Sequence, residues 1–298
     1  GISLDQGVQI TATASPGKGE IKVTGASNPL IHQNVIKELS AFFPDVYSYD
    51  WTLHQDTNLP MSQGFGLSAA GAISCALAIQ RALELPEEKS RAIAIHVAHR
   101  VERQLSGGLG DVAALYAGGV ELRLEPGCPP LGEDLGGSGA IVSWYEDIPA
   151  VVCWRHTASR HTSTYIDDGN WKLSISAAGE HSLFGLREGT WGIERWAELL
   201  DASATFAERS GLLEDAERVD LLHMVGGAII SSGLVDSGLA VRLCMLGESA
   251  IAFPMNLSQD LPVEWQEKLV HSLGERGLGA LAVNLADDAL NLHFPSQD

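Results

Sequence analysis

Basic residues are scarce in this sequence of 298 residues. Lysine and arginine together number 19, against 38 aspartates and glutamates, and the formal net charge is −19 at pH 7. A protein that binds nucleic acid presents a basic face to the phosphate backbone, so the composition argues against that class. The same acidic field repels anionic ligands. An anion site in this chain would therefore need backbone amides, a metal ion or a few arginines close by.

Clustered cysteines and long apolar runs are also missing. Four cysteines, at positions 75, 128, 153 and 244, lie far apart without the CxxC spacing of many zinc sites, and we expect reduced thiols. No apolar run reaches the roughly 18 residues of a membrane helix, and no signal peptide is visible. These absences favour a protein of the cytoplasm. The hydrophobic content of 45% is nevertheless enough for a sizeable core.

A loop with two glycines and two serines, PMSQGFGLSAAG at residues 60–71, precedes an alanine-rich segment that contains no proline. Alanine and leucine are good helix formers, which predicts a helix from about Leu67 to Leu83. The first amides of a helix lack internal partners and, together with the helix dipole, favour a bound phosphate. Gly64 and Gly66 would let the backbone approach that phosphate, and Ser68 could reach it or a metal ion. A helix start made of small residues for close packing is an equally open interpretation.

A second glycine-rich turn, SGGLGD at residues 106–111, follows a helix predicted over residues 87–105. Asp111 could orient or deprotonate a substrate hydroxyl, although on spacing alone a helix cap before Val112 is favoured. On the preceding helix, His96, His99 and Glu102 recur every three residues. This spacing allows a metal site, but a solvated polar face is the favoured interpretation, with Glu102 kept as a possible Mg²⁺ ligand.

The remaining pattern predicts strands and helices in mixed order, which indicates an α+β fold. Residues 1–25 look like a hairpin with strands at 8–13 and 21–24, and the turn at 15–19. The chain should divide near residues 143–149. Residues 155–164 concentrate cations and hydroxyls. Further helices are predicted at 32–43, 112–117, 191–210, 216–231 and 264–276, and further strands at 47–59, 120–124, 150–154, 241–246, 250–253 and 281–285.

Together these segments resemble the GHMP small-molecule kinases, whose phosphate loop reads roughly PxxxGLGSSAA before a helix. Phe65 and Leu67 depart from that consensus, whereas Ser68 matches its second serine. The sequence SQGFGLSAAGA of this loop is similar to that of the archaeal members that phosphorylate pantoate. Three further segments resemble the same members: HRVE at 99–102 with GGLGDVAA at 107–114, GG at 118–119 with Arg123 and PGCPPLG at 126–132, and CMLGES at 244–249 in place of the third family motif.

The resemblance implies a two-domain GHMP kinase fold. Residues 1–147 would form a domain like the second domain of ribosomal protein S5, and residues 148–298 a ferredoxin-like domain. It also implies ATP-dependent phosphorylation of (R)-pantoate to 4-phosphopantoate in coenzyme A biosynthesis, in a cytoplasmic protein that we expect to be a homodimer.

The resemblance further implies a role for each motif. Asp111 would be the catalytic base, Ser68 and Glu102 would bind Mg²⁺, and Gly247 would close the far side of the phosphate pocket. Gly108 and Gly110, with Arg155, Arg160 or Arg103 as the cation, would receive the substrate. The predicted ATP-binding residues are Pro60, Ser62, Gln63, Gly64, Phe65, Gly66, Leu67, Ser68, Ala69 and Ala70.

One departure leaves alternatives open. GHMP kinases normally begin with a strand and a PGH-type segment, whereas this sequence begins at GISLD, which looks like the strand after it. Either an upstream piece precedes this sequence or the protein lacks it. The alternatives are another GHMP kinase acting on mevalonate, homoserine or a sugar, a catalytically silent ligand sensor with the same fold, and, as the least favoured, an interaction protein.

Overall fold

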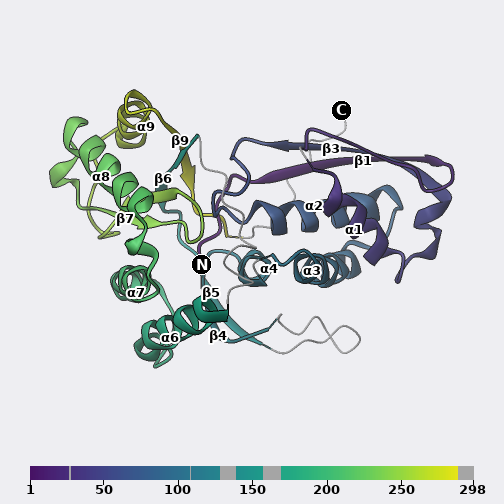
Figure 1. The fold of residues 1–298 in the computed structure, drawn as a ribbon, viewed down its shortest axis with the longest axis horizontal. Helices are drawn as coiled ribbons and strands as arrows, with labels where there is room; N and C mark the ends of the chain where they lie inside the picture. Colours follow the sequence, from purple (N-terminus) through teal and green to yellow (C-terminus); the bar gives the residue numbers. More distant parts are fainter. Residues whose placement is uncertain (27, 108, 128–138, 157–168, 288–298) are drawn as a thin grey trace.

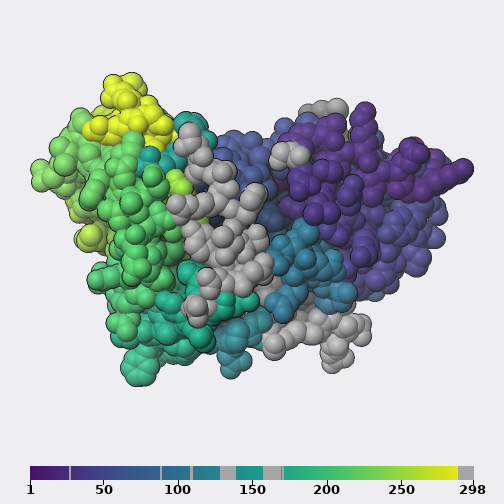
Figure 2. All heavy atoms as spheres, viewed as in Figure 1, coloured from purple at the N-terminus to yellow at the C-terminus, as the bar shows by residue number. Residues whose placement is uncertain are grey.

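The computed structural model describes residues 1–26, 28–107, 109–127, 139–156 and 169–287. Its N-terminal and C-terminal halves lie toward opposite ends of the longest axis, as the purple-to-blue and green-to-yellow regions of Figure 2 show. Strands and helices alternate without a regular rhythm in both halves, so the predicted α+β class is confirmed. None of the described helices is long and apolar enough to cross a membrane.

The N-terminal half contains a three-stranded sheet in the order β1-β3-β2. β1 (Val8–Pro16) pairs with β3 (Tyr49–Thr57) in antiparallel register, and β2 (Ile21–Thr24) pairs with β3 in parallel. The predicted hairpin is therefore wrong, because β3 lies between the two strands that were expected to pair. Trp51 and Leu53 of β3 are 1% and 0% exposed, and a strand this apolar takes the central position.

Asp50 of β3 explains how the link between β1 and β2 is held without a hairpin. Its carboxylate accepts hydrogen bonds from the amides of Lys18 and Glu20, at 2.8 and 2.9 Å. The link therefore folds onto β3, and the glycine-lysine-glycine segment inside it is a structural turn, as its sequence predicts.

Helices cover one face of this sheet, as Figure 1 shows. The alanine-rich α2 (Leu67–Ala82) lies at the centre and contacts β1, α1 and α3. Its Ala69, Ala72 and Ala76 are fully buried, because small side chains let neighbouring elements approach closely. The other helices of this half are α1 (Leu30–Leu39), α3 (Glu87–Gln104) and α4 (Leu109–Ala117).

A small antiparallel pair, β4 (Val120–Glu125) with β5 (Ala140–Trp144), follows α4. β5 was not predicted, and it ends within residues 143–149, where the chain was expected to divide. The described part of the chain also contains short 3₁₀ segments at Pro44–Ser48, Ile193–Arg195, Leu212–Glu214 and Val235–Ser237.

The C-terminal half contains a four-stranded antiparallel sheet in the order β7-β8-β6-β9. The chain order β6-α8-β7-β8-α9-β9 is the β-α-β-β-α-β arrangement of ferredoxin-like domains, and among the described residues α6 and α7 lie between β6 and α8. The predicted ferredoxin-like half is thus confirmed. Its elements are β6 (Pro149–Arg155), α6 (Gly169–Leu186), α7 (Trp196–Arg209), α8 (Ala216–Ser231), β7 (Leu239–Leu243), β8 (Ser249–Pro254), α9 (Trp265–Glu275) and β9 (Leu278–Asn284).

Helix α6 was missed because it has no clear apolar stripe. Leu173 and Phe184 are 73% and 76% exposed on it, so its pattern lacks the periodicity that identifies an amphipathic helix. The helix predicted from residue 191 begins instead at Trp196, after the 3₁₀ turn.

One apolar cluster connects the two halves. Leu59 and Leu67, at either end of the loop before α2, share this cluster with Val152 of β6 and Phe253 of β8. Because all four side chains are buried, the loop at residues 60–66 is fixed against the C-terminal sheet. The fold thereby brings the first glycine-rich motif to the junction of the two halves.

Candidate active site

The loop before α2 has three residues in the left-handed backbone region. Ser62, Gly64 and Gly66 have φ values of 61°, 81° and 66°. Gly66 is the N-cap of α2, and no side chain caps the first turn. The amides that begin α2 are therefore available to an anion, because a helix start leaves its first donors without internal partners.

The two glycines also serve close packing. A Cβ atom on Gly64 would overlap the carbonyl oxygen of Cys244, and one on Gly66 would lie 3.4 Å from both Cβ and Cγ of Asp111. The loop is thus confined between the turn after β7 and the first turn of α4. The two interpretations of this motif, anion loop and packing device, are compatible, because tight packing fixes the amides in place.

Ser68, in the first turn of α2, donates a hydrogen bond from its hydroxyl to Oε1 of Glu102 on α3. Glu102 is 1% exposed, and burial raises the pKa of its carboxyl to about 7, against the opposing effect of the Ser68 hydrogen bond. The charge of Asp111 raises this pKa further. A buried carboxyl that is partly protonated near neutral pH is poised to exchange its proton for a cation.

Asp111 lies in the first turn of α4, which begins at Leu109. It is therefore not the cap residue that its spacing favours, because the helix starts two positions earlier. Its side chain is open to solvent, yet desolvation by surrounding protein raises the pKa to about 6, while Arg123 acts to lower it. The protein around this carboxyl, which includes Arg123, therefore desolvates it although part of the residue stays exposed.

Arg123 of β4 is the cation that sequence reasoning did not assign to the site. Its guanidinium lies 3.3 Å from where a Cβ of Gly110 would be, and its charge acts on Asp111. Within the described ranges no carboxylate forms an ion pair with it. The available signal was a single arginine within an apolar strand that follows the second glycine-rich motif.

Comparison with known proteins agrees with this arrangement. Residues 31–119 match the sequence profile described as GHMP kinases N terminal domain. A pantoate kinase of Thermococcus kodakarensis is 27% identical, with a match that covers 72% of this chain and 67% of that protein. A pantoate kinase of Methanospirillum hungatei is 29% identical over 43% of this chain and 44% of that protein, so this second match spans less than half of the relative.

A solved structure described as a phosphotransferase related to the CoA biosynthesis pathway superposes with a TM-score of 0.66. It is 22% identical and covers 96% of this chain and 86% of its own. The superposition supports the fold, and the profile places a GHMP kinase N-terminal domain at residues 31–119. Over this range the chain resembles the GHMP kinases. The family resemblance that its motifs predicted is confirmed.

The loop at residues 60–66 contributes mainly its backbone to the site. Gln63 is 2% exposed, and its side chain donates to the carbonyl oxygen of Arg155 at 3.1 Å. Phe65 packs edge-on against Trp154 with ring centroids 6.0 Å apart, while Leu67 and Ala69 are buried. These predicted ATP-binding residues can meet a phosphate only through their amides, because their side chains are used in packing.

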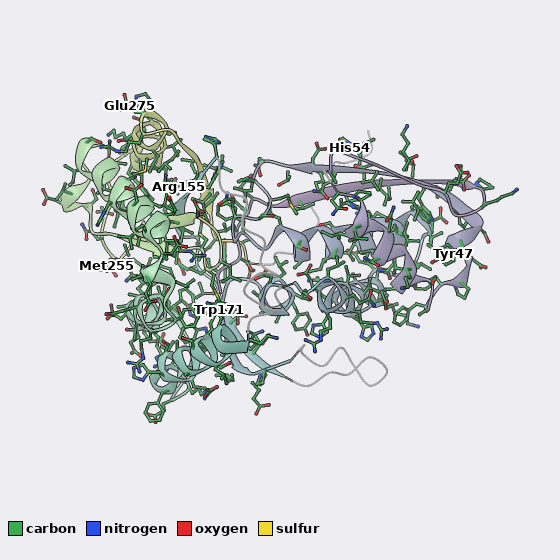
Figure 3. The ribbon with its side chains drawn as sticks, in the orientation of Figure 1. Tyr47, His54, Arg155, Trp171, Met255 and Glu275 are labelled. Carbon is green, nitrogen blue, oxygen red and sulfur yellow. The ribbon has the colours of Figure 1, made fainter. Side chains whose placement is uncertain are left out.

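The arginines that were predicted to bind the substrate have different surroundings from one another. Arg155, labelled in Figure 3, lies in ion pairs with Glu217, Glu248 and Asp220, the first two at 3.8 Å. Arg103 is exposed on α3. Arg160 and Gly108 lie outside the described residues. Among the arginines considered, Arg123 is the one beside Asp111.

The histidines that precede Glu102 on α3 do not complete a metal site. No group of three or more His, Cys, Asp or Glu side chains in the described part of the chain could hold a metal ion. His96 packs edge-on against Phe42, with ring centroids 5.7 Å apart, and burial lowers the pKa of His99. Ser68 and Glu102 still offer two oxygens, which suits an ion that takes one or two protein ligands plus phosphate oxygens.

Glu102→Gln should raise the free energy of unfolding of the metal-free protein at pH 8 by about 2 kcal/mol. The folded pKa lies above the ordinary glutamate value of 4.5, so the carboxyl favours folding below that value, and this contribution is lost as the pH rises through about 7. The gain in the variant should therefore shrink as the pH is lowered toward 4.5. Denaturant titrations at several pH values measure it.

Glu38→Gln is the matched control, because Glu38 is also a buried helix glutamate. Burial alone would raise its pKa, but hydrogen bonds from Gln104 and Arg100 outweigh that effect and lower it. This variant should lose stability at pH 8, the opposite sign. Equal stability of wild type and Glu102→Gln at pH 8 would contradict the raised pKa.

Proposed function

We propose that the protein transfers the terminal phosphoryl group of ATP to the primary hydroxyl of (R)-pantoate, giving 4-phosphopantoate. The observation that carries the proposal is the meeting of two pairs at the start of α2: Ser68 with Glu102, and Asp111 with Arg123. The first pair suits the metal-bound phosphates, and the second suits a small acid that also has a hydroxyl. The relatives named pantoate kinase support this choice of substrate.

The phosphates of ATP would lie on the amides that begin α2, where Gly64 and Gly66 keep the backbone free of side chains. Ser68 and Glu102 would bind Mg²⁺, which supplies charge neutralisation of the phosphate oxygens. Glu102 is fully effective as a ligand when ionised, and its pKa of about 7 implies that it loses a proton as the ion binds. Gly247 would lie on the far side of the loop, where its backbone contacts Gln63.

Asp111 would orient the hydroxyl of pantoate and accept its proton. A general base works best with a pKa near the operating pH, and desolvation moves Asp111 in that direction, to about 6. A Cβ on Gly66 of the phosphate loop would lie 3.4 Å from Cγ of Asp111, so a hydroxyl bound to this carboxylate would lie near the transferred group.

Arg123 would pair with the carboxylate of pantoate. A guanidinium forms two parallel hydrogen bonds with a carboxylate and supplies both charge and orientation. Its place beside Gly110 sets the acid end of the substrate against the glycine-rich turn before Asp111. In a protein with a net charge of −19, a local cation is needed to attract an anionic substrate.

Two alternative functions make different demands on this site. Another small hydroxy acid could use the same base and arginine, since neither contact measures the length of the substrate. A ligand sensor would not need a carboxyl whose pKa is raised toward neutrality. The raised pKa of Asp111 therefore favours an enzyme. The cytoplasmic location and the homodimeric state stay predictions. The free thiols of Cys75, Cys153 and Cys244 are compatible with a reducing compartment.

A panel assay for ADP release tests the substrate. With MgATP, we expect release with pantoate, and little with mevalonate, homoserine or the amide of pantoate, because the amide has no carboxylate for Arg123. Arg123→Met should raise the KM for pantoate by about tenfold or more and leave the KM for MgATP within about twofold. Equal turnover of pantoate and its amide would refute the arginine contact, and release with mevalonate or homoserine alone would refute the substrate.

Asp111→Asn should lower kcat by about 10²- to 10⁴-fold, because it removes a positioned base. The melting temperature should not fall, since Asp111 does not cap α4 and its charged form is desolvated in the folded protein. Steady-state kinetics and thermal unfolding of the same preparation check both statements. Wild-type turnover in this variant would rule out Asp111 as the base.

A further inference from the structure

The turn between β7 and β8 has a strained backbone. Met245 has a φ of 34°, a backbone angle that residues other than glycine rarely adopt. The amide of Gly247 donates a hydrogen bond to the carbonyl oxygen of Cys244 at 3.3 Å. Backbone strain of this kind persists only where the surrounding structure enforces it, and it concentrates at functional sites. A specific interaction must therefore hold this turn.

The turn lies back to back with the phosphate loop. A Cβ on Gly247 would overlap the carbonyl group of Gln63, and a Cβ on Gly64 would overlap the carbonyl oxygen of Cys244. The hydroxyl of Ser249 donates to the carbonyl oxygen of Gln63. The turn therefore determines where the main chain of residues 63 and 64 can lie, and with it the start of α2.

Arg218 of α8 holds the turn from the opposite side. It is 2% exposed, and its guanidinium donates to the carbonyl oxygens of Leu246 at 2.9 Å and Gly247 at 3.2 Å. Asp215, the N-cap of α8, accepts from the amide of Glu217 and also lies 3.4 Å from the Arg218 guanidinium. A planar fork with several donors can bridge adjacent carbonyls, which a lysine cannot do in the same way.

We propose that Arg218 is a positioning residue for nucleotide binding: it fixes the strained turn at residues 244–247, which in turn fixes the amides of the phosphate loop. Arg218 is buried, and its contacts with the carbonyl oxygens of Leu246 and Gly247 connect it to the phosphate loop through the turn. The inference deepens the proposed function and rests on ATP binding at that loop. It does not depend on pantoate being the phosphoryl acceptor.

Arg276 provides a matched control. It follows α9, and its guanidinium donates to the carbonyl oxygen of Gly227 at 2.7 Å and to the hydroxyl of Ser231 at 2.9 Å. Both partners belong to α8, the helix that also carries Arg218, but they lie nearer its C-terminal end. Arg276→Met therefore removes a similar contact from the same helix without touching the turn.

The test measures the Kd of MgAMP-PNP by calorimetry and the KM and kcat with MgATP, for the wild type, Arg218→Met, Arg218→Lys and Arg276→Met. All measurements are made well below each melting temperature. Small misplacements of a site cost up to about 10²-fold in rate, so kcat/KM for MgATP should fall by about 10- to 100-fold in Arg218→Met and by less in Arg218→Lys. The Kd should rise in the same order, and the KM for the acceptor should stay within about twofold.

A merely structural arginine gives a different result. If Arg218→Met and Arg276→Met lower the melting temperature alike and both bind MgAMP-PNP as the wild type does, the proposal is overturned. Should Arg218→Met fail to fold, wild-type affinity in Arg218→Lys overturns it equally. A wild type that binds MgAMP-PNP but does not phosphorylate pantoate would refute the substrate, while the order of the three affinities would still decide the role of Arg218.

Discussion

The buried contact between the Ser68 hydroxyl and the Glu102 carboxyl is the constraint on which the site depends. It connects the first turn of α2 to the end of α3, and it places an ionisable group where water is excluded. An isolated buried carboxylate is costly, so the metal-free protein raises the pKa of Glu102 to about 7 instead of ionising it fully. Stability and function oppose each other here, since the residue that would bind the cation weakens the fold without it.

The second constraint is the backbone-to-backbone contact between the phosphate loop and the β7–β8 turn. Gly64 and Gly247 are required there because a Cβ on either would overlap the opposite main chain. The apolar cluster that joins Leu59 and Leu67 to the C-terminal sheet surrounds this contact. Under the proposed function, nucleotide and acceptor would meet at this junction, to which both halves contribute backbone.

Local patterns predicted most helices and strands and the loop at residues 60–71, whereas the site roles of Glu102 and Asp111 came from the family resemblance and stay predictions. What they could not predict depends on contacts between distant segments. The hairpin at residues 1–25 is wrong because β3 occupies the central position, and α6 lacks an apolar stripe. Arg155 was one of the predicted substrate cations, in a segment rich in cations and hydroxyls, yet Glu217 and Asp220 of α8 form ion pairs with it. Arg123 lies near Asp111 because α4 packs against β4, and the sequence alone does not show this packing.

Counting the protons released on nucleotide binding tests the central claim most directly. Calorimetric titration of AMP-PNP with Mg²⁺, in buffers of different ionisation enthalpy, gives that number. The account predicts about one proton more for the wild type than for Glu102→Gln at pH 6, because a carboxyl with a pKa of about 7 is mostly protonated there and must ionise to bind the ion. The difference should fall toward zero by about pH 8.5. Equal proton release by both proteins at pH 6 would contradict it.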